Sequence, residues 1–310
     1  MHRGIVPQLL PGQKDSTQKK ATTKMQKLTS RSLAPDFGME ISGIDFSKPV
    51  DQSDIDFIRN AWVEANGVLL FRNQDITPAD HVRLTSYFGG VYDKGATANP
   101  VLAHYYADGF PQIYRVSNKK VNGKPLGRED AGTYWHSDST WDPSQPRGSI
   151  LHAIEIPSAG GDTMFANMYQ AYDALSEPMK KMLDGLTAEH SLAAAVLRTS
   201  YAKEFSGKID EAAKKRAIWP VVRVHPYSGR KALFVNPGFT SRILELSTAE
   251  SEVVLNLLFK HATSPEFIYR HSWQLHDVLM WDNYCNMHYA VANYKAHGDR
   301  FLHRTTVLPD

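Results

Sequence analysis

Two histidines and one carboxylate in this chain have the spacing of ligands to a single metal ion. His136 and Asp138 are separated by one residue, and His288 lies far along the chain from both. Two histidines and one carboxylate occupy one face of an octahedral Fe(II) ion and leave the opposite face open for oxygen and a co-substrate. The pattern therefore predicts an iron-dependent oxygenase, in a fold that returns His288 to the side of His136.

A second H-x-D pattern, His297-Gly298-Asp299, requires a choice between two candidate sites. His136 and Asp138 lie in Tyr134–Trp141, which is rich in the aromatic and hydroxyl residues that favour strands. Residues i and i+2 of a strand share a face, so both side chains can converge on one ion. His297 and Asp299 instead flank a glycine, which is typical of a turn. We therefore expect a strand at 134–141 and assign the metal site to the first pair.

The composition excludes several other classes of protein. The chain has 310 residues, 42% of them hydrophobic and 22% charged, as in a soluble globular protein with one elaborated domain. A net charge of +2 gives no electrostatic reason to expect nucleic acid, and no apolar stretch approaches the ~20 residues that span a bilayer. A single cysteine, Cys285, forms no internal disulfide and fits a reducing compartment. We expect a cytoplasmic protein with no nucleic-acid or membrane partner.

The first thirty residues differ in composition from the rest. They carry several lysines among Gln, Ser and Thr, with Asp15 as the only acid. This composition is typical of a flexible basic tail, with a cleaved organelle-targeting segment as the alternative. No linker or internal repeat follows, so we predict a tail over residues 1–32 and one domain over residues 33–310.

Helices are predicted where an N-cap or first-turn residue precedes apolar residues that recur at helical spacing. Their starts are Ser53 or Asp54, Thr77–Pro78 and the capping box Ser247–Glu250. A helical insert is expected around residues 168–200. Residues 91–131 hold many turn-forming and polar residues, and we interpret this segment as an active-site lid.

Beyond the H-x-D motif the pattern is mainly of short strands separated by turn signals. They are expected at residues 148–156, 162–165, 221–224, 232–235, 267–269, 278–281 and 301–308. Many short strands with added helices predict a mainly β fold with helical inserts, the double-stranded β-helix or jelly roll. The mouth of such a barrel can hold a metal and a small ligand.

The last predicted strand carries two arginines. On a strand, Arg300, Leu302 and Arg304 share one face, while Phe301 and His303 share the other. If the first face lines the barrel, both guanidinium groups point toward the metal cavity. A buried guanidinium needs an anionic partner, and its planar fork suits a carboxylate or sulfonate. The pattern predicts one or two bound anions; the alternative is that one arginine is exposed or paired with a protein acid.

Through these and further motifs, the chain resembles the taurine dioxygenase and 2,4-D dioxygenase family of Fe(II)/2-oxoglutarate-dependent oxygenases from about residue 35 onward. The matching motifs are Trp135–Asp138, Gly160–Thr163, Val224–Pro226, Leu233–Asn236, Trp281–Asn283, His288 and Arg300–Arg304. The resemblance implies that His136, Asp138 and His288 bind iron. It also implies that Thr163 and Arg300 hold the distal carboxylate of 2-oxoglutarate. Arg304 then faces the acidic group of the substrate and the inner carboxylate of 2-oxoglutarate.

The resemblance further implies hydroxylation of a small organic acid at a carbon next to a heteroatom, with 2-oxoglutarate and O2 giving succinate and CO2. The candidate substrates are an alkyl sulfonate, a sulfate ester or an aryloxyalkanoate, and the hydroxylated product then cleaves. Trp141, Phe239 and Ser139 are expected to contact the substrate, with ordinary core packing as the alternative for Phe239. Ala131–Tyr134 lacks the asparagine that taurine dioxygenases place here, which argues against taurine itself. Relatives imply a homo-oligomer, a dimer or tetramer.

Two other functional classes use parts of the same pattern. A zinc hydrolase can use the same three ligands, but the chain has no H-E-x-x-H motif, and that reading leaves Arg300 and Arg304 unexplained. A non-catalytic barrel that binds a small acid explains the arginines but not the metal triad.

His104 is a further candidate substrate contact.

Overall fold

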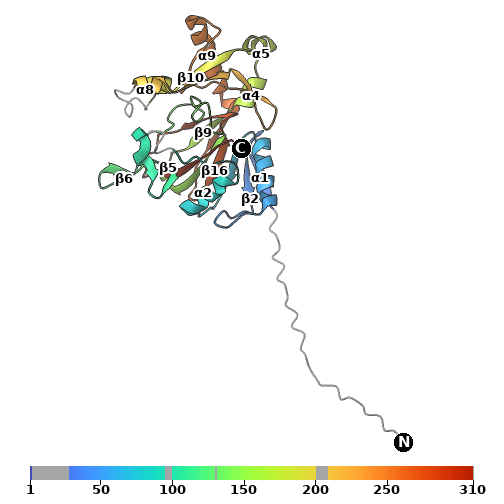
Figure 1. Cartoon of the computed structure of the whole chain (residues 1–310), viewed down its shortest axis with the longest axis vertical. Helices are drawn as coiled ribbons and strands as arrows, with labels where there is room; N and C mark the ends of the chain where they lie inside the picture. Colours follow the sequence, from blue (N-terminus) through green and yellow to red (C-terminus); the bar gives the residue numbers. More distant parts are fainter. Residues whose placement is uncertain (2–27, 95–99, 130, 200–208, 310) are drawn as a thin grey trace.

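A large sheet runs through the middle of the molecule (Figure 1). The structure, a computed structural model, describes residues 1, 28–94, 100–129, 131–199 and 209–309. In spatial order the strands of this main sheet are β1 (Thr29–Ala34), β2 (Phe37–Ser42), β3 (Val68–Phe71), β16 (Val278–Asp282), β8 (Gly148–Glu155), β18 (Phe301–Val307), β5 (Phe110–Ser117) and β4 (Tyr106–Ala107). Neighbours are antiparallel except β2 and β3, which pair in parallel.

A smaller antiparallel sheet faces the main sheet. Its order is β15 (Ile268–His271), β9 (Thr163–Asn167) and β17 (Asn286–Ala290). Phe165 of β9 packs with Trp281 of β16 and Leu302 of β18 in one buried cluster, so apolar side chains of both sheets fill the space between them. Two facing sheets with a shared core are the predicted jelly roll, and the fold class is confirmed.

Two helices cover the outer face of the main sheet. They are α1 (Gln52–Glu64) and α2 (Pro78–Ser86), which lie beside the sheet in Figure 1. Trp62 of α1 and Leu84 of α2 are buried with Leu69 and Met280 of the sheet. Burial of each such side chain contributes about 1.5–3 kcal/mol, which holds both helices in place.

The remaining elements form a separate layer at one end, the upper part of Figure 1. Its helices are α4 (Met168–Asp173), α5 (Glu177–Leu183), α6 (Leu192–Arg198), α8 (Ile209–Ala213) and α9 (Thr248–Ala262). Its strands are β10 (Thr187–Ser191), β11 (Arg216–Pro220), β12 (Val222–Val224), β13 (Lys231–Leu233) and β14 (Thr240–Ile243). Short elements elsewhere are η1 (Pro100–Tyr105), η2 (Pro265–Phe267), β6 (Lys120–Val121) and β7 (Lys124–Pro125).

Helix starts agree with the sequence signals at two of three positions. Thr77 and Ser247 each form a capping box, with Asp80 and Glu250 respectively as the partner three residues on. The predicted cap of the first helix at Ser53 or Asp54 is wrong, because α1 begins at Gln52 and Asp51 is the N-cap. The Asp51 carbonyl accepts from the N–H groups of Asp54 and Ile55, so the helix starts earlier without a side-chain cap.

The predicted helical insert at residues 168–200 is only partly helical. It contains α4, α5 and α6, but β10 lies between α5 and α6 and pairs with β11 on one side and β14 on the other. Pairing with strands distant in sequence therefore decides the conformation of Thr187–Ser191, because local pattern alone does not show those partners.

The predicted tail at residues 1–32 lies mostly on residues 2–27, outside the described residues. Its described end, residues 29–32, lies in β1, where Thr29 pairs with Ser42 and Ala34 with Phe37. Edge pairing with β2 therefore places these residues in the main sheet. Among the helices that the structure describes, none has the length and apolarity needed to cross a membrane.

Three histidines are buried together between α2 and the main sheet. His152 of β8 lies directly opposite His303 of β18, and the ring of His81 from α2 lies 6.1 Å from that of His152. His81 Nε2 lies 3.1 Å from Thr305 Oγ1 and 3.2 Å from the carbonyl oxygen of Ile150. Burial lowers the pKa of His81 well below its usual value and lowers those of His152 and His303 to about 4. The folded protein therefore holds these rings neutral at pH 7.

We expect the free energy of unfolding to fall as pH decreases from about 6.5 to about 4. In that range the unfolded chain takes up protons on these histidines and the folded chain does not, so acid favours unfolding by about 1.4 kcal/mol per pKa unit per group. Urea unfolding of the metal-free protein between pH 7 and pH 4 measures the slope of the free energy of unfolding against pH. His303→Gln should flatten it, whereas His104→Gln, at an exposed position, should not. An unchanged slope in His303→Gln would contradict this account.

Candidate metal centre

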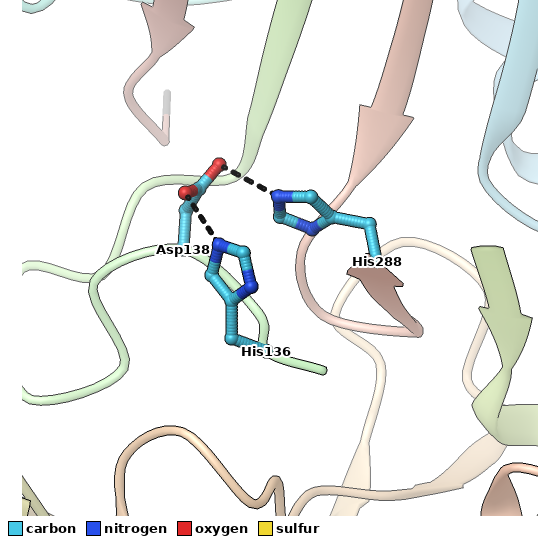
Figure 2. Close-up of side chains that lie close together, drawn as sticks. All are labelled: His136, Asp138 and His288. Carbon is cyan, nitrogen blue, oxygen red and sulfur yellow. Dashed lines mark ion pairs between the residues drawn. The ribbon is translucent and has the colours of Figure 1, made fainter. Parts of the chain in front are cut away.

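A pair of backbone hydrogen bonds brings the three predicted metal ligands together. The His136 N–H donates to the His288 carbonyl at 3.1 Å, and the His288 N–H donates to the His136 carbonyl at 2.7 Å. His288 is the middle residue of β17, so this bridge fixes the loop that carries His136 and Asp138 against the smaller sheet. Figure 2 shows the three side chains converging on one point.

The predicted strand at 134–141 is wrong. His136 makes a single isolated bridge, and the chain turns from Asp138 onward. Ser139 has a φ of 50°, and its carbonyl accepts from the Asp142 N–H at 2.9 Å, which closes the turn. A left-handed residue cannot continue a strand. The two ligands still converge, because the bridge sets the direction of His136 and the turn directs Asp138 toward it.

The distances within the triad suit one ion. Asp138 Oδ1 lies 3.7 Å from His136 Nε2, and Asp138 Oδ2 lies 3.9 Å from His288 Nε2. Ligand atoms of all three residues lie within 4.8 Å of one another, and all three residues are buried. Two atoms that each bind one ion at about 2.1 Å are at most about 4.2 Å apart, so small shifts of these side chains admit a metal.

Hydrogen bonds outside the triad set the orientation of its ligands. His136 Nδ1 lies 2.8 Å from the Tyr134 carbonyl, to which it donates, so Nε2 keeps its lone pair for a metal. Ser149 Oγ donates to Asp138 Oδ2 at 2.7 Å, and the Asp138 N–H donates to Asn283 Oδ1 at 3.2 Å. Asn283 thus helps to fix the backbone at Asp138.

The charge states of the triad favour a cation. Burial opposes the charge on Asp138, but Arg304, His288 and His136 together hold the pKa of this carboxyl well below its usual range. Burial lowers the pKa of His136, and burial followed by the neighbouring His136 lowers that of His288 well below its usual value. At neutral pH the site therefore presents one carboxylate and two neutral imidazoles, the protonation state that metal binding requires.

Arg300 and Thr163 lie together, as the family resemblance implied. Arg300 Nε donates to the Gly161 carbonyl at 2.9 Å, and Nη2 lies 3.4 Å from Thr163 Oγ1, which also accepts from Trp273 Nε1 at 3.0 Å. Arg300 is 3% exposed, and burial lowers its pKa to about 10. Within the described residues no carboxylate forms an ion pair with it. A buried cation with only neutral partners is the kind of group that an anionic ligand stabilises.

Arg304 has a protein acid as its partner, the alternative considered from the sequence. Its Nη1 donates to Asp138 Oδ1 at 3.0 Å, and its guanidinium carbon lies 5.1 Å from the centre of the Tyr114 ring. Leu302, between the two arginines, is fully buried in the core that joins the sheets. The predicted face of Arg300, Leu302 and Arg304 is therefore the interior face of the barrel.

A cavity of about 530 Å³ opens beside the triad. His136, Asp138 and Arg304 line it, and so do all three predicted substrate contacts, Ser139, Trp141 and Phe239. Phe239 is also part of a core cluster, so its position fits either interpretation, and the substrate contact stays a prediction. His288, Thr163 and Arg300 lie beyond the lining of this cavity.

Sequence reasoning missed several residues of the cavity wall. Among the described residues, six come from the predicted lid segment, and they are Tyr92, Leu102, Tyr106, Tyr114, Arg128 and Ala131. The sequence predicted that this segment is a lid, but its apolar residues do not recur at helical or strand spacing. The pattern therefore could not show which of its side chains face the cavity. His104, the further candidate contact, is exposed and does not line the cavity.

A second buried cluster, His225, Asp282 and Cys285, is structural. His225 Nε2 lies 3.2 Å from Asp282 Oδ2, and Nδ1 accepts from the N–H groups of Tyr227 and Ser228 at 3.2 and 3.1 Å. Both ring nitrogens are thus used within the fold, which leaves none for a metal. His225 stabilises the turn at 225–228.

Comparisons with known proteins agree with this site. The chain is 32% identical over 293 residues to the alpha-ketoglutarate-dependent 2,4-dichlorophenoxyacetate dioxygenase of Burkholderia sp. (strain RASC), covering 91% of this chain and 94% of that protein. It is 32% identical over 284 residues to an alkylsulfatase of Acinetobacter baylyi, covering 87% and 81%. The crystal structure of a taurine dioxygenase from Burkholderia xenovorans matches with a TM-score of 0.75 and 32% identity, covering 91% of this chain and 90% of that one.

The family model described as taurine catabolism dioxygenase TauD, TfdA family matches residues 29–306. These matches confirm the predicted class, a dioxygenase that uses 2-oxoglutarate, Fe(II) and O2, and the zinc-hydrolase and binding-protein alternatives do not hold. The chain belongs to the TauD/TfdA family of dioxygenases.

Proposed function

We propose that His136, Asp138 and His288 hold the Fe(II) of this dioxygenase and that it hydroxylates a small organic acid. The observation that carries the proposal is the triad itself, three buried ligand atoms within 4.8 Å whose hydrogen bonds leave metal-binding atoms available. When bound, iron and 2-oxoglutarate supply oxygen activation, with succinate and CO2 as co-products. The chain's own residues orient the reactants and exclude water.

Thr163 and Arg300 bind the distal carboxylate of 2-oxoglutarate in this proposal. Arg300 donates through Nε and Nη2 to Gly161 and Thr163, which fixes the plane of its guanidinium group. A fixed planar fork binds a carboxylate through charge-assisted hydrogen bonds. The Thr163 hydroxyl already accepts from Trp273, so its own proton is available to the same carboxylate.

The substrate in this proposal is an alkyl sulfonate, a sulfate ester or an aryloxyalkanoate, hydroxylated at the carbon next to its heteroatom. The named activities of the relatives, on an aryloxyacetate, alkyl sulfates and taurine, span these classes. Trp141 and Phe239 offer apolar contact, Ser139 a hydroxyl, and Arg304 a positive charge beside the triad. An oxygenated carbon bearing a sulfur or oxygen leaving group breaks down without a hydrolytic base.

We also propose that the protein works in the cytoplasm as a homo-oligomer, a dimer or tetramer, without nucleic-acid or membrane partners. The single Cys285 is buried and reduced, and the net charge is only +2. Light scattering of the purified protein measures the oligomeric state, and a monomer would contradict the proposal.

Asp138→Asn should weaken Fe(II) binding by more than the about 10–100-fold that loss of an outer-shell partner costs, because it removes the only negative charge of the triad. Anaerobic titration with Fe(II) measures the dissociation constant. The matched control is Asp299→Asn in the second H-x-D, which should bind iron as the unsubstituted protein does. Equal losses in the two variants would contradict the assignment.

Arg300→Gln should raise the KM for 2-oxoglutarate by about 10–100-fold, the cost of losing a charge-assisted hydrogen bond. The weak visible absorption of the anaerobic Fe(II)–2-oxoglutarate chelate reports binding, and succinate formation reports turnover. Arg270→Gln is the control, because Arg270 is exposed and pairs with Asp162 at 2.7 Å. An Arg300→Gln protein with an unchanged KM would remove Arg300 from the co-substrate site.

A further inference from the structure

Thr140 lies in the sequence between two residues that line the substrate cavity. Ser139 and Trp141 contribute to the cavity wall, whereas Thr140 is fully buried. Both polar groups of Thr140 that can accept are hydrogen-bonded to the layer of helices and strands at one end of the molecule, the hydroxyl to Asn236 and the carbonyl to Trp219. A buried hydroxyl with partners on distant segments ties those segments together, because each partner is costly to leave unpaired.

Asn236 fixes the direction of the first of these hydrogen bonds. Its Oδ1 accepts from the backbone N–H of Phe239 at 2.8 Å, and a backbone N–H can only donate. The fold therefore sets the orientation of the amide, with Nδ2 toward Thr140. Nδ2 donates to Thr140 Oγ1 at 3.3 Å. The Thr140 hydroxyl accepts from Asn236 and keeps its own proton for another partner.

His190 is in place to receive that proton. Its Nδ1 lies 2.9 Å from Thr140 Oγ1, and its ring stacks on Phe234 with the ring centres 5.7 Å apart. His190 lies on β10, which Figure 1 shows in the upper layer. Burial lowers its pKa to about 3, so the ring is neutral at pH 7 and Nδ1 can accept from the hydroxyl.

Trp219 holds the backbone of Thr140 to the same small sheet. Its Nε1 donates to the Thr140 carbonyl at 2.7 Å. Trp219 lies on β11, directly opposite Ala188 of β10, the strand that also carries His190. The side chain and the main chain of Thr140 are therefore held by neighbouring strands, and the residues on either side of it have a fixed support.

The turn that begins at Asn236 carries a different part of the cavity wall. The Asn236 N–H donates to Thr240 Oγ1 at 2.8 Å, and the Thr240 N–H donates to the Asn236 carbonyl at 3.1 Å. Between them lies Phe239, which lines the cavity with its ring 6.0 Å from that of His136. The hydrogen bond from Asn236 to Thr140 thus joins the wall at Trp141 to the wall at Phe239.

We propose that Thr140 is a positioning residue that sets the separation of Trp141 and Phe239 and thereby the width of the acid that the enzyme accepts. Aromatic rings select a ligand by shape only when their own supports are fixed, and Thr140 and Asn236 supply that support to both rings. This inference rests on the proposed function, in which the two aromatic residues contact the substrate.

Amide hydrogen exchange tests the link between the walls without any substrate. Thr140→Val keeps the shape of the side chain and removes the hydroxyl. Exchange should become about 5–30-fold faster in peptides from both walls, residues 139–146 and 236–240, as loss of a buried hydrogen bond permits. Asn236→Ala should likewise accelerate exchange across the network, in residues 139–146, and it serves if Thr140→Val is poorly folded. Acceleration confined to the substituted wall would overturn the inference.

Two matched variants show whether the effect belongs to the Thr140 hydroxyl. Thr140→Ser keeps the hydroxyl and should leave exchange in both walls nearly unchanged. Thr85→Val removes another buried threonine hydroxyl, which lies 2.6 Å from Thr305 Oγ1 between α2 and the main sheet, and should not accelerate either wall. Equal acceleration by Thr85→Val, or no difference between Thr140→Ser and Thr140→Val, would contradict the role of Thr140.

Binding of acids of different width tests the effect on selectivity. Phenoxyacetate and the wider 2-naphthyloxyacetate are titrated by calorimetry into protein loaded with Mn(II) and 2-oxoglutarate. In Thr140→Val the ratio of their dissociation constants, wide over narrow, should fall about 5–30-fold, while that of 2-oxoglutarate stays unchanged. A general loss of stability would weaken both acids alike, so an unchanged ratio would overturn the inference.

The two measurements separate this inference from the proposed function. Failure of 2-oxoglutarate to bind the unsubstituted protein would overturn the proposed co-substrate site, and failure of both acids would overturn the choice of an aryloxyalkanoate. In either case the exchange rates of the two walls still support or overturn the link through Thr140. Normal binding of all three ligands with an unchanged ratio in Thr140→Val would leave the dioxygenase assignment intact and remove Thr140 from substrate selection.

Discussion

The bridge between His136 and His288 is the interaction on which the site depends. Its two backbone hydrogen bonds, at 3.1 and 2.7 Å, join a loop to the middle of β17. β17 in turn is held by β9, and Phe165 of β9 packs against the main sheet through Trp281. The core between the sheets thereby fixes the separation of two residues that are far apart in sequence. Loss of this packing would separate the ligands before it altered either side chain.

Asp138 links the chemistry of the site to its electrostatics. It accepts from Ser149 and Arg304 and lies within 4 Å of both histidine Nε2 atoms. A buried carboxylate is stable only with such partners, and they hold its pKa low enough that it stays ionised. Arg304 therefore balances the charge of Asp138 in this structure.

The sequence was most informative where chemistry requires particular residue types. The triad follows from the spacing of its residue types, whereas the pairing of Thr163 with Arg300 and the place of Trp141 beside the cavity follow from the family resemblance. It was least informative where contacts between distant segments override local pattern. Residues 134–141 form a turn with one bridge because Ser139 adopts a φ of 50°. Thr187–Ser191 is a strand because two partner strands flank it.

Regular and irregular segments contribute different parts of the site. His288, Thr163 and Arg304 lie on strands of the two sheets, whose register is fixed by burial on the inner faces. Much of the cavity wall instead comes from irregular segments between residues 91 and 146, where side chains are not tied to a common register. His136 and Asp138 lie in the same stretch, but the bridge to β17 fixes His136, so substitutions at the other lining residues alter the shape and charge of the cavity. Relatives with the same fold are named for activities on an aryloxyacetate, alkyl sulfates and taurine, and a cavity wall built largely from irregular segments is where such proteins can differ.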